Sequence, residues 1–195
     1  MPSVSRKYLK FCRPTFYCES NSTEIKKLAK KIVNDSKSSE KMVKKIFLWV
    51  RDKIQWDITK VVGIRRLLKR KPLRGNCTDK VNLFIALCRS LKIPARYVFL
   101  YCSLKRKKKN LPKKVGHVIA EVLIDGKWVI ADPTFGKHTK KLVEVSQLGK
   151  PSWKKAYIIF RTRGLFPLMV WIDNFLMPYS PSSKKLKHEI EKLKK

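Results

Sequence analysis

Acidic residues are scarce in this chain. Its 195 residues include 14 Asp and Glu against 47 Lys and Arg, which gives a formal net charge of +33. Such a charge fits solvated lysines on every face, or a polyanionic partner such as nucleic acid, an anionic polymer or an acidic membrane surface. We favour the first interpretation because the basic residues are spread along the whole chain and are not concentrated on one element.

Long apolar runs are also missing. The longest late run, at residues 164–179, is too short to span a bilayer and is interrupted by Pro167, Asp173 and Asn174, which leaves a buried element or an interfacial patch. The first residues are basic but lack the apolar stretch of a secretory signal. We therefore expect no transmembrane segment and a cytoplasmic location.

Five cysteines, an odd number at irregular spacing, do not form the pattern of a disulfide framework. Cys12 and Cys18 lack the C-x2-C spacing typical of a zinc site. The chain has no internal repeat, no P-loop and no GxGxxG motif, which argues against NTP and dinucleotide chemistry. We expect reduced thiols, no bound metal and no cofactor.

The length and the 44% of hydrophobic residues are sufficient to bury one core. We divide the chain into an irregular lead-in at residues 1–20, a single domain at 21–180 and a basic C-terminal tail or helix at 181–195. The motifs that define the domain occupy residues 40–136.

Apolar residues at helical spacing predict two helices early in the chain. The first follows Asn21 as its cap, with Glu24 three residues later, and the second runs through residues 40–56. Residues 60–75 form a basic connector with a short helix that ends before Pro72.

A third amphipathic pattern begins at Cys77, and three runs rich in β-branched and aromatic residues follow at 95–102, 116–124 and 127–135. Asp125-Gly126, between the last two runs, is a strong hairpin signal. Residues 140–148 are a candidate for one more strand. The sequence thus predicts an α+β fold in which the helix that starts at Cys77 packs on an antiparallel sheet.

Cys77 is a candidate nucleophile because it stands at the start of a predicted helix. The N–H groups and partial positive charge of a helix N-terminus lower the pKa of a thiol. Cys88 lies on the apolar stripe of the same helix and is assigned to the core, while Cys102 ends a predicted strand. The structural alternative for Cys77 is a small buried apolar residue.

A nucleophilic cysteine needs a base and a group that orients the base. Of the three histidines, His138 and His188 lie in polar segments and are expected to be solvated, whereas His117 opens a predicted strand. With Asp125-Gly126 as the turn, Asp132 becomes a diagonal neighbour of His117 on the same face, about 7–8 Å away at the backbone. Asp132 precedes a proline, so a turn-forming role is its alternative.

These motifs resemble those of the transglutaminase-like superfamily of papain-like cysteine enzymes. The matching segments are "RGNCTDKVNLFIALCRSLKIPARYV" and "GHVIAEVLIDGKWVIADPTFG", with 40 residues from Cys77 to His117 and 15 from His117 to Asp132. The chain departs from the usual pattern at Ile119, where relatives often carry an aromatic residue, and at Lys92, where glycine is usual.

The resemblance implies a papain-like, transglutaminase-like core and acyl transfer through a thioester. It assigns Cys77 as nucleophile, His117 as general base and acid, and Asp132 as the orienting carboxylate. An oxyanion hole is also required. The N–H of Cys77 is one expected donor, and Trp56 or Gln55 is the candidate for the second.

Three functions remain open from the sequence. We favour hydrolysis of a peptide or amide bond over protein-glutamine cross-linking, which needs an amine channel that excludes water. A non-catalytic basic module that binds nucleic acid or another polyanion is the alternative from a different class. A hydrolase whose basic loop at residues 105–114 steers an acidic peptide or protein substrate toward His117 combines the two ideas.

Overall fold

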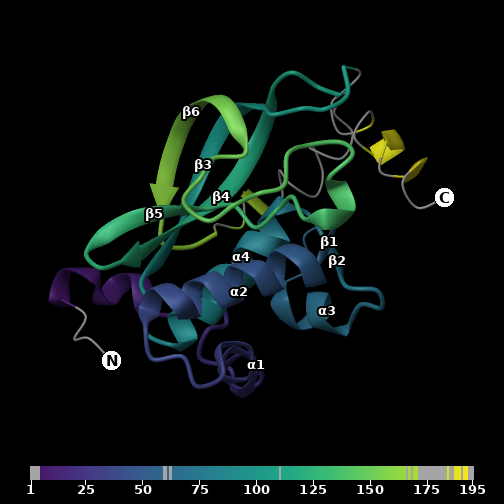
Figure 1. The fold of residues 1–195 in the computed structure, drawn as a ribbon. Helices are drawn as coiled ribbons and strands as arrows, with labels where there is room; N and C mark the ends of the chain where they lie inside the picture. The colour runs from purple at the N-terminus through teal and green to yellow at the C-terminus, as the bar shows by residue number, and fades with distance from the viewer. Residues whose placement is uncertain are drawn as a thin grey trace.

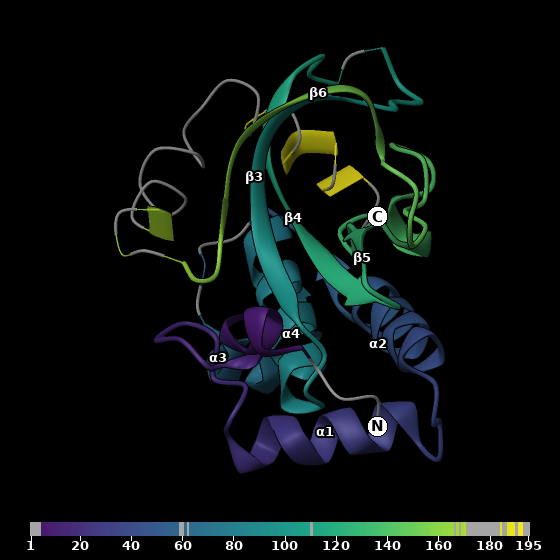
Figure 2. The same cartoon turned by 90° about the vertical axis from the view of Figure 1, so that its left-hand side faces the viewer.

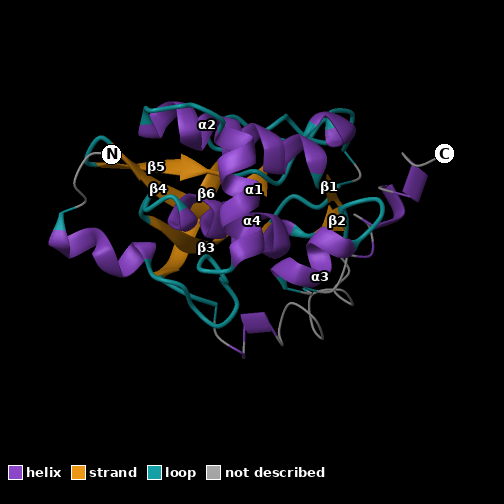
Figure 3. Cartoon of the chain, turned by 90° about the horizontal axis from the view of Figure 1, so that it is seen from below, coloured by secondary structure: helices purple, strands orange, loops and turns teal. Residues whose placement is uncertain are grey.

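Helices gather on one side of an antiparallel sheet (Figures 1 and 3). The computed structural model of the protein describes residues 5–58, 61, 63–109, 111–165, 167, 169, 170, 184, 187–189, 191 and 192. Most of the late apolar run at 164–179 and of the basic tail at 181–195 lies outside the described residues, so the expectations for both segments remain predictions. Over the part of the chain that is described, no helix is both long and apolar enough to cross a bilayer.

The central helix is α4 (Cys77–Ser90), in which every residue from Thr78 to Arg89 is buried. Figure 3 looks at the molecule from the helical side and shows the other helices around α4. The helices that pack against it are α1 (Thr23–Val33), α2 (Ser39–Lys53), α3 (Ile64–Lys69) and the 3-10 helix η1 (Arg6–Cys12). The helix predicted to begin at Cys77 is therefore confirmed, and it forms the centre of the helical layer.

The start of α1 corrects one detail of the prediction. Its cap is Ser22 and not Asn21, because the Ser22 hydroxyl accepts a hydrogen bond from the N–H of Ile25 at 3.2 Å. Ser22 has the extended backbone of a cap residue (φ −66°, ψ 145°), which satisfies one of the free N–H groups of the first turn. Glu24, in that turn, lies favourably near the positive end of the helix.

The sheet has the strand order β5-β4-β3-β6, and all neighbours are antiparallel. Its strands are β3 (Ala95–Leu104), β4 (Val115–Ile124), β5 (Lys127–Ala131) and β6 (Trp153–Thr162). The predicted hairpin is confirmed: Ile124 pairs with Lys127 across Asp125 and Gly126, whose φ angles of 47° and 78° are those of a type I′ turn. Pairing in this hairpin ends at Ala120 and Ala131.

The sequence after residue 136 was predicted less well. Residues 140–148 were expected to contain a strand, but Val143 makes only an isolated bridge to Arg106. The fourth strand of the sheet is β6, which pairs with β3 and curves away from β4 and β5 (Figure 2). A 3-10 turn, η2 (Lys137–Thr139), lies between β5 and β6.

Two apolar clusters hold the layers together. The larger lies between helices and sheet, where the rings of Phe47 on α2 and Phe84 on α4 meet edge to face at 6.3 Å. Burial of a side chain of this size stabilises the fold by about 2–3 kcal/mol. The second cluster includes Trp56, Leu100, Ile119, Phe135, Trp153 and their neighbours. The candidate site lies where the second cluster meets the start of α4.

Candidate active site

Cys77 is the first residue of α4 and is delivered there by a short parallel pair, β1 (Gln55–Trp56) and β2 (Arg74–Gly75). Asn76 caps the helix, because its side-chain oxygen accepts a hydrogen bond from the N–H of Asp79 at 2.9 Å. The positive end of the α4 dipole therefore lies beside the thiol.

The other cysteines do not share this position. Cys77 is partly exposed, whereas the remaining four are buried, and none of the five forms a disulfide. Burial raises the pKa of Cys88, and it raises the pKa of Cys102 to about 11. Both side chains thus stay protonated at neutral pH, and the assignment of Cys88 to the core is confirmed.

His117 lies on β4 opposite Leu100 of β3, with its side chain buried. Its ring stacks on Phe135 at 5.7 Å, and its Nε2 lies 2.8 Å from Oδ2 of Asp132. Burial acts to lower the pKa of His117, but the charge and hydrogen bond of Asp132 outweigh it, and the Cys77 thiol adds to the rise. The pKa of His117 is therefore well above its ordinary value.

Asp132 is completely buried. Its carboxylate accepts hydrogen bonds from His117, from the hydroxyl of Ser152 and from the N–H of Thr134, the last at 3.1 Å. Burial alone raises the pKa of Asp132, yet the charge of His117 and these donors hold it below its usual value. The carboxylate is thus ionised, and it fixes the orientation and charge of the imidazole.

The structure brings Cys77, His117 and Asp132 together. Ser152 was missed because it precedes β6 in a segment that gave no secondary-structure signal. A serine of this kind carries no distinctive spacing, and only the fold places it beside Asp132.

The two candidate oxyanion donors other than Cys77 lie close by but use their main-chain groups elsewhere. The N–H of Trp56 donates to Nε2 of His138 at 2.7 Å, and the N–H of Gln55 donates to the carbonyl of Leu73 at 2.9 Å. The Trp56 ring packs edge to face on Phe135 at 5.0 Å and thereby borders the site. The main-chain N–H groups of Trp56 and Gln55 are therefore already in use.

His138 was expected to be solvated, and this expectation is wrong. The ring is half-buried, and it accepts the Trp56 hydrogen bond through Nε2. Burial and the nearby Lys80 charge lower the pKa of His138 to about 4, so the ring is neutral at pH 7. His188, in contrast, is exposed as predicted.

A buried lysine lies one turn after Cys77 on α4. The ammonium of Lys80 is inaccessible to solvent, and it donates to the carbonyls of Arg51 at 3.0 Å and Ile54 at 2.5 Å, at the end of α2. Burial lowers the pKa of Lys80 to about 7, against the raising effect of Asp132 and Asp52. Lys80 thus anchors to α4 the segment that leads into Gln55 and Trp56.

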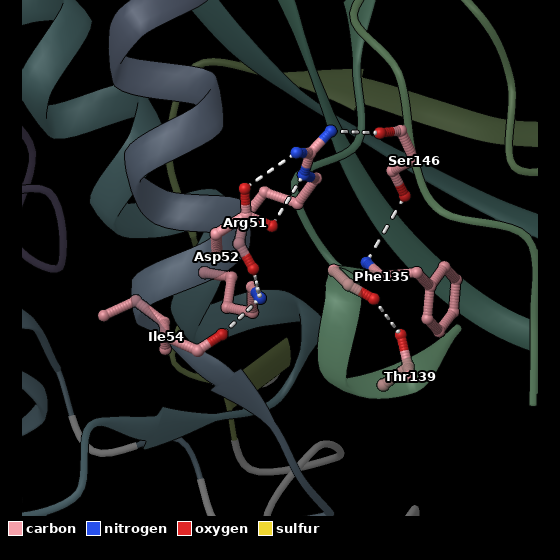
Figure 4. Close-up of polar contacts among 8 residues, drawn as sticks. Arg51, Asp52, Ile54, Phe135, Thr139 and Ser146 are labelled. Atoms are coloured by element: carbon pink, nitrogen blue, oxygen red, sulfur yellow. Dashed lines mark hydrogen bonds and ion pairs between the residues drawn. The ribbon is translucent and has the colours of Figure 1, made fainter. Parts of the chain in front are cut away.

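The same end of α2 holds the loop that carries Phe135 (Figure 4). Arg51 forms a bidentate ion pair with Asp52 at 2.7–2.9 Å and donates to the carbonyl of Ser146 at 2.9 Å. The Ser146 hydroxyl in turn accepts from the N–H of Phe135 at 3.3 Å. Because the ring of Phe135 stacks on that of His117, this network helps to hold the imidazole in place.

No group of three or more His, Cys, Asp or Glu side chains in the described ranges is placed to hold a metal ion. The arrangement is that of an α+β protein with a cysteine at a helix start, a histidine on the adjoining sheet and a buried carboxylate behind it. Chemically, it can generate a thiolate and return a proton to a leaving group.

Comparison with known proteins identifies the family. Residues 26–133 match the model of the transglutaminase-like superfamily, which is more than half of the chain, and the protein belongs to this superfamily. The predicted fold class is confirmed by the helix-and-sheet architecture and by this family. A search of curated proteins gives no match.

Two solved structures are similar. A "putative cysteine protease" from Cytophaga hutchinsonii shares 24% identity over 83% of this chain, with a TM-score of 0.58. This chain spans 57% of the length of that protein. A "putative protease" from Parabacteroides distasonis shares 18% identity over 64% of this chain and 24% of its own, with a TM-score of 0.44. The similarity to the Cytophaga hutchinsonii protein shows a shared fold.

Proposed function

We propose that the protein is a cysteine enzyme that cleaves an amide or peptide bond by acyl transfer. The observation that carries the proposal is the position of Cys77, at the start of α4 and beside a buried His117 whose Nε2 lies 2.8 Å from Asp132. Each of the three groups has the environment that its role requires: a helix N-terminus for the thiolate, a carboxylate for the imidazolium, and buried donors for the carboxylate.

The reaction proceeds in two halves. The Cys77 thiolate attacks the carbonyl carbon, the C–N bond breaks, and His117 donates its proton to the departing amine, which leaves a thioester on Cys77. His117 then removes a proton from water, the resulting hydroxide attacks the thioester, and the C–S bond breaks to release the acid and the thiolate. The raised pKa of His117 favours the imidazolium-thiolate pair from which the first half starts.

The oxyanion formed in each half needs two donors. The N–H of Cys77 is the first, since the first N–H groups of a helix have no partner within it. We assign the second to a side chain, the indole of Trp56 or the amide of Gln55, because their main-chain N–H groups are already used. One such donor contributes about 2.7–4 kcal/mol to transition-state binding.

Two features guide the proposal for the substrate: the acyl acceptor that the reaction needs and the positive charge of the chain. Water needs no dedicated binding channel, whereas a cross-linking amine does, so we propose hydrolysis over protein-glutamine cross-linking. The basic loop at residues 105–114 leads directly into β4 and His117, and it is suited to steer an acidic peptide or protein toward the site. Five free thiols fit a reducing compartment such as the cytoplasm.

Site-resolved alkylation with iodoacetamide near pH 7 tests the nucleophile. Cys77 should react at least about tenfold faster than a peptide cysteine, and His117→Ala should abolish that excess. Cys102→Ala is the matched control and should leave the rate at Cys77 unchanged, because Cys102 is buried and protonated. If Cys77 reacts like a peptide thiol whether or not His117 is present, the protein is not a cysteine enzyme.

A peptide and amide screen then separates the reactions. Hydrolysis releases an acid and an amine in equal amounts, and Cys77→Ala should prevent both. Incorporation of an added primary amine in preference to water would instead identify a cross-linking enzyme.

A further inference from the structure

A pocket of about 370 Å³ lies where η1 meets the start of β3 and the end of β6. Figure 2 shows η1 lying across the start of β3. The residues that line the pocket are Lys10, Phe11, Arg96, Arg161, Thr162 and Arg163. Its volume is at the lower end of the range of about 300–1,000 Å³ that small-molecule sites occupy.

Two of the arginines are held in place by one buried carboxylate. Glu121 on β4 accepts from Nε and Nη2 of Arg96 at 2.7 Å, and from Nε and Nη2 of Arg161 at 3.1–3.3 Å. Each guanidinium therefore contacts Glu121 through its Nε–Nη2 edge, and its Nη1 group remains as a further donor. The Arg96 group also lies 4.1 Å from the centre of the Trp128 ring, which fixes its plane.

The main chain around the pocket is fixed as well. The buried Arg89 donates to the carbonyls of Arg13 at 3.1 Å, of Ala95 at 2.7 Å and of Arg163 at 2.6 Å. These carbonyls belong to the three segments that form the pocket walls. The donors are thus organised before any ligand arrives, which reduces the entropic cost of binding.

The charge of the pocket is not balanced by the protein. The pocket is lined by four basic side chains, those of Lys10, Arg96, Arg161 and Arg163. The carboxylate of Glu121 balances one of these charges, which leaves an excess of three positive charges. Within the described ranges, neither Lys10 nor Arg163 has an ion-pair partner. A ligand with two negative charges would neutralise most of this excess.

We propose that this pocket binds a small organic phosphate. A phosphate monoester carries nearly two charges at pH 7 and offers three acceptor oxygens, which suits several convergent donors better than one planar carboxylate does. The pocket has room for an organic group beside the phosphate, and the ring of Phe11 provides an apolar surface for it. The pocket lining includes neither Cys77 nor His117 nor Asp132.

Isothermal titration with phenyl phosphate in about 0.15 M salt tests the proposal, since salt screens attraction by exposed charges. The wild-type protein should bind one equivalent, and it should bind inorganic phosphate and benzoate at least about tenfold more weakly, because the first lacks the ring and the second the charge. Arg163→Gln should weaken binding of phenyl phosphate about tenfold, while its main-chain carbonyl still accepts from Arg89.

Lys155→Gln is the matched control, since it removes one positive charge from an exposed position of β6 outside the pocket. It should change the affinity less than about twofold. Equal losses in both variants, or several equivalents bound per chain, would show general attraction to a basic surface and overturn the proposal. Equal binding of benzoate would overturn the phosphate assignment. Cys77→Ala should bind as the wild type does, so the catalytic proposal and this one can fail separately.

Discussion

Nε2 of His117 lies 2.8 Å from Oδ2 of Asp132, although the pairing of their two strands ends one residue before Asp132. The hairpin thus brings His117 and Asp132 roughly into range of each other. The carboxylate of Asp132, on the first residue after β5, then makes the contact with the imidazole. Pro133 has no N–H for a further ladder bond, and Asp132 instead accepts from the N–H of Thr134. The end of the strand is what directs this carboxylate at the imidazole.

Asp132→Asn should reduce the alkylation rate of Cys77 at pH 7 by about tenfold, toward the rate of a peptide cysteine. An amide cannot stabilise the imidazolium, so the pKa of His117 falls and the thiolate loses its partner. Alkylation rates between pH 5 and 9 provide the measurement. Asp125→Asn is the matched control, because Asp125 is exposed in the same hairpin with a φ of 47° that Asn accepts readily. A rate for Asp132→Asn equal to that of the control would remove Asp132 from the site.

His138→Leu should make stability less sensitive to mild acid. The pKa of His138 is lowered to about 4, from an ordinary value of 6.5. Between these pH values the unfolded chain binds a proton that the folded chain does not, so the contribution of His138 to stability falls as the pH falls. Urea unfolding at pH 7 and pH 5 should show a smaller loss in His138→Leu than in the wild type.

His188→Gln serves as the control for this experiment, since His188 is exposed. It should retain the wild-type difference between pH 7 and pH 5. The pKa of His117 shifts in the opposite direction, so its contribution is present below its ordinary value and is lost as the pH rises through the raised one. Only the comparison between variants therefore isolates His138.

Lys80→Met should flatten the dependence of stability on alkaline pH. The pKa of Lys80 is about 7 in the folded protein, against 10.5 ordinarily. Between these values the unfolded chain holds the extra proton, so wild-type stability gains up to about 1.4 kcal/mol per pH unit from this group as the pH rises. The free energy of unfolding at pH 7, 8 and 9 should rise more steeply in the wild type than in Lys80→Met.

Lys44→Met is the corresponding control, because Lys44 is exposed on α2 and should leave the slope unchanged. If Lys80→Met keeps the wild-type slope, Lys80 is charged in the folded protein throughout this range.

The sequence supports the nucleophile, the base and the carboxylate because each depends on local chemistry. A helix start at Cys77 and a two-residue turn at Asp125-Gly126 are short-range signals, and the turn brings the chain segments that contain His117 and Asp132 near each other, although strand pairing ends at Ala120 and Ala131. The burial of Lys80 could not be predicted in this way. A lysine in a chain with 47 basic residues carries no sign that its ammonium is paired with two carbonyls.

Strand β6 escaped prediction for a different physical reason. A half-buried strand alternates between apolar and polar residues, but Tyr157, Ile158, Ile159 and Phe160 are consecutive and all exposed at the sheet edge. A register shift against β3 between Phe99 and Leu100 further breaks the period of two. Neither edge position nor bulge can be read from local sequence, and Ser152, which depends on β6 for its position, was missed with it.

Gly75→Ala should impair Cys77 more than it impairs the fold. A Cβ at Gly75 would lie 2.8 Å from Cβ of Asp79 and 3.1 Å from Cδ1 of the buried Leu67, so the first turn of α4 has to move. We expect the alkylation rate of Cys77 to fall at least about tenfold, because small displacements of a nucleophile from its base are costly. Gly63→Ala is the control, since its φ of 78° makes alanine strained while no atom lies within 4 Å. It should lower the melting temperature and leave the rate at Cys77 unchanged. A Gly75→Ala protein that alkylates at the wild-type rate would mean that the close contact at Gly75 does not set the position of the thiol.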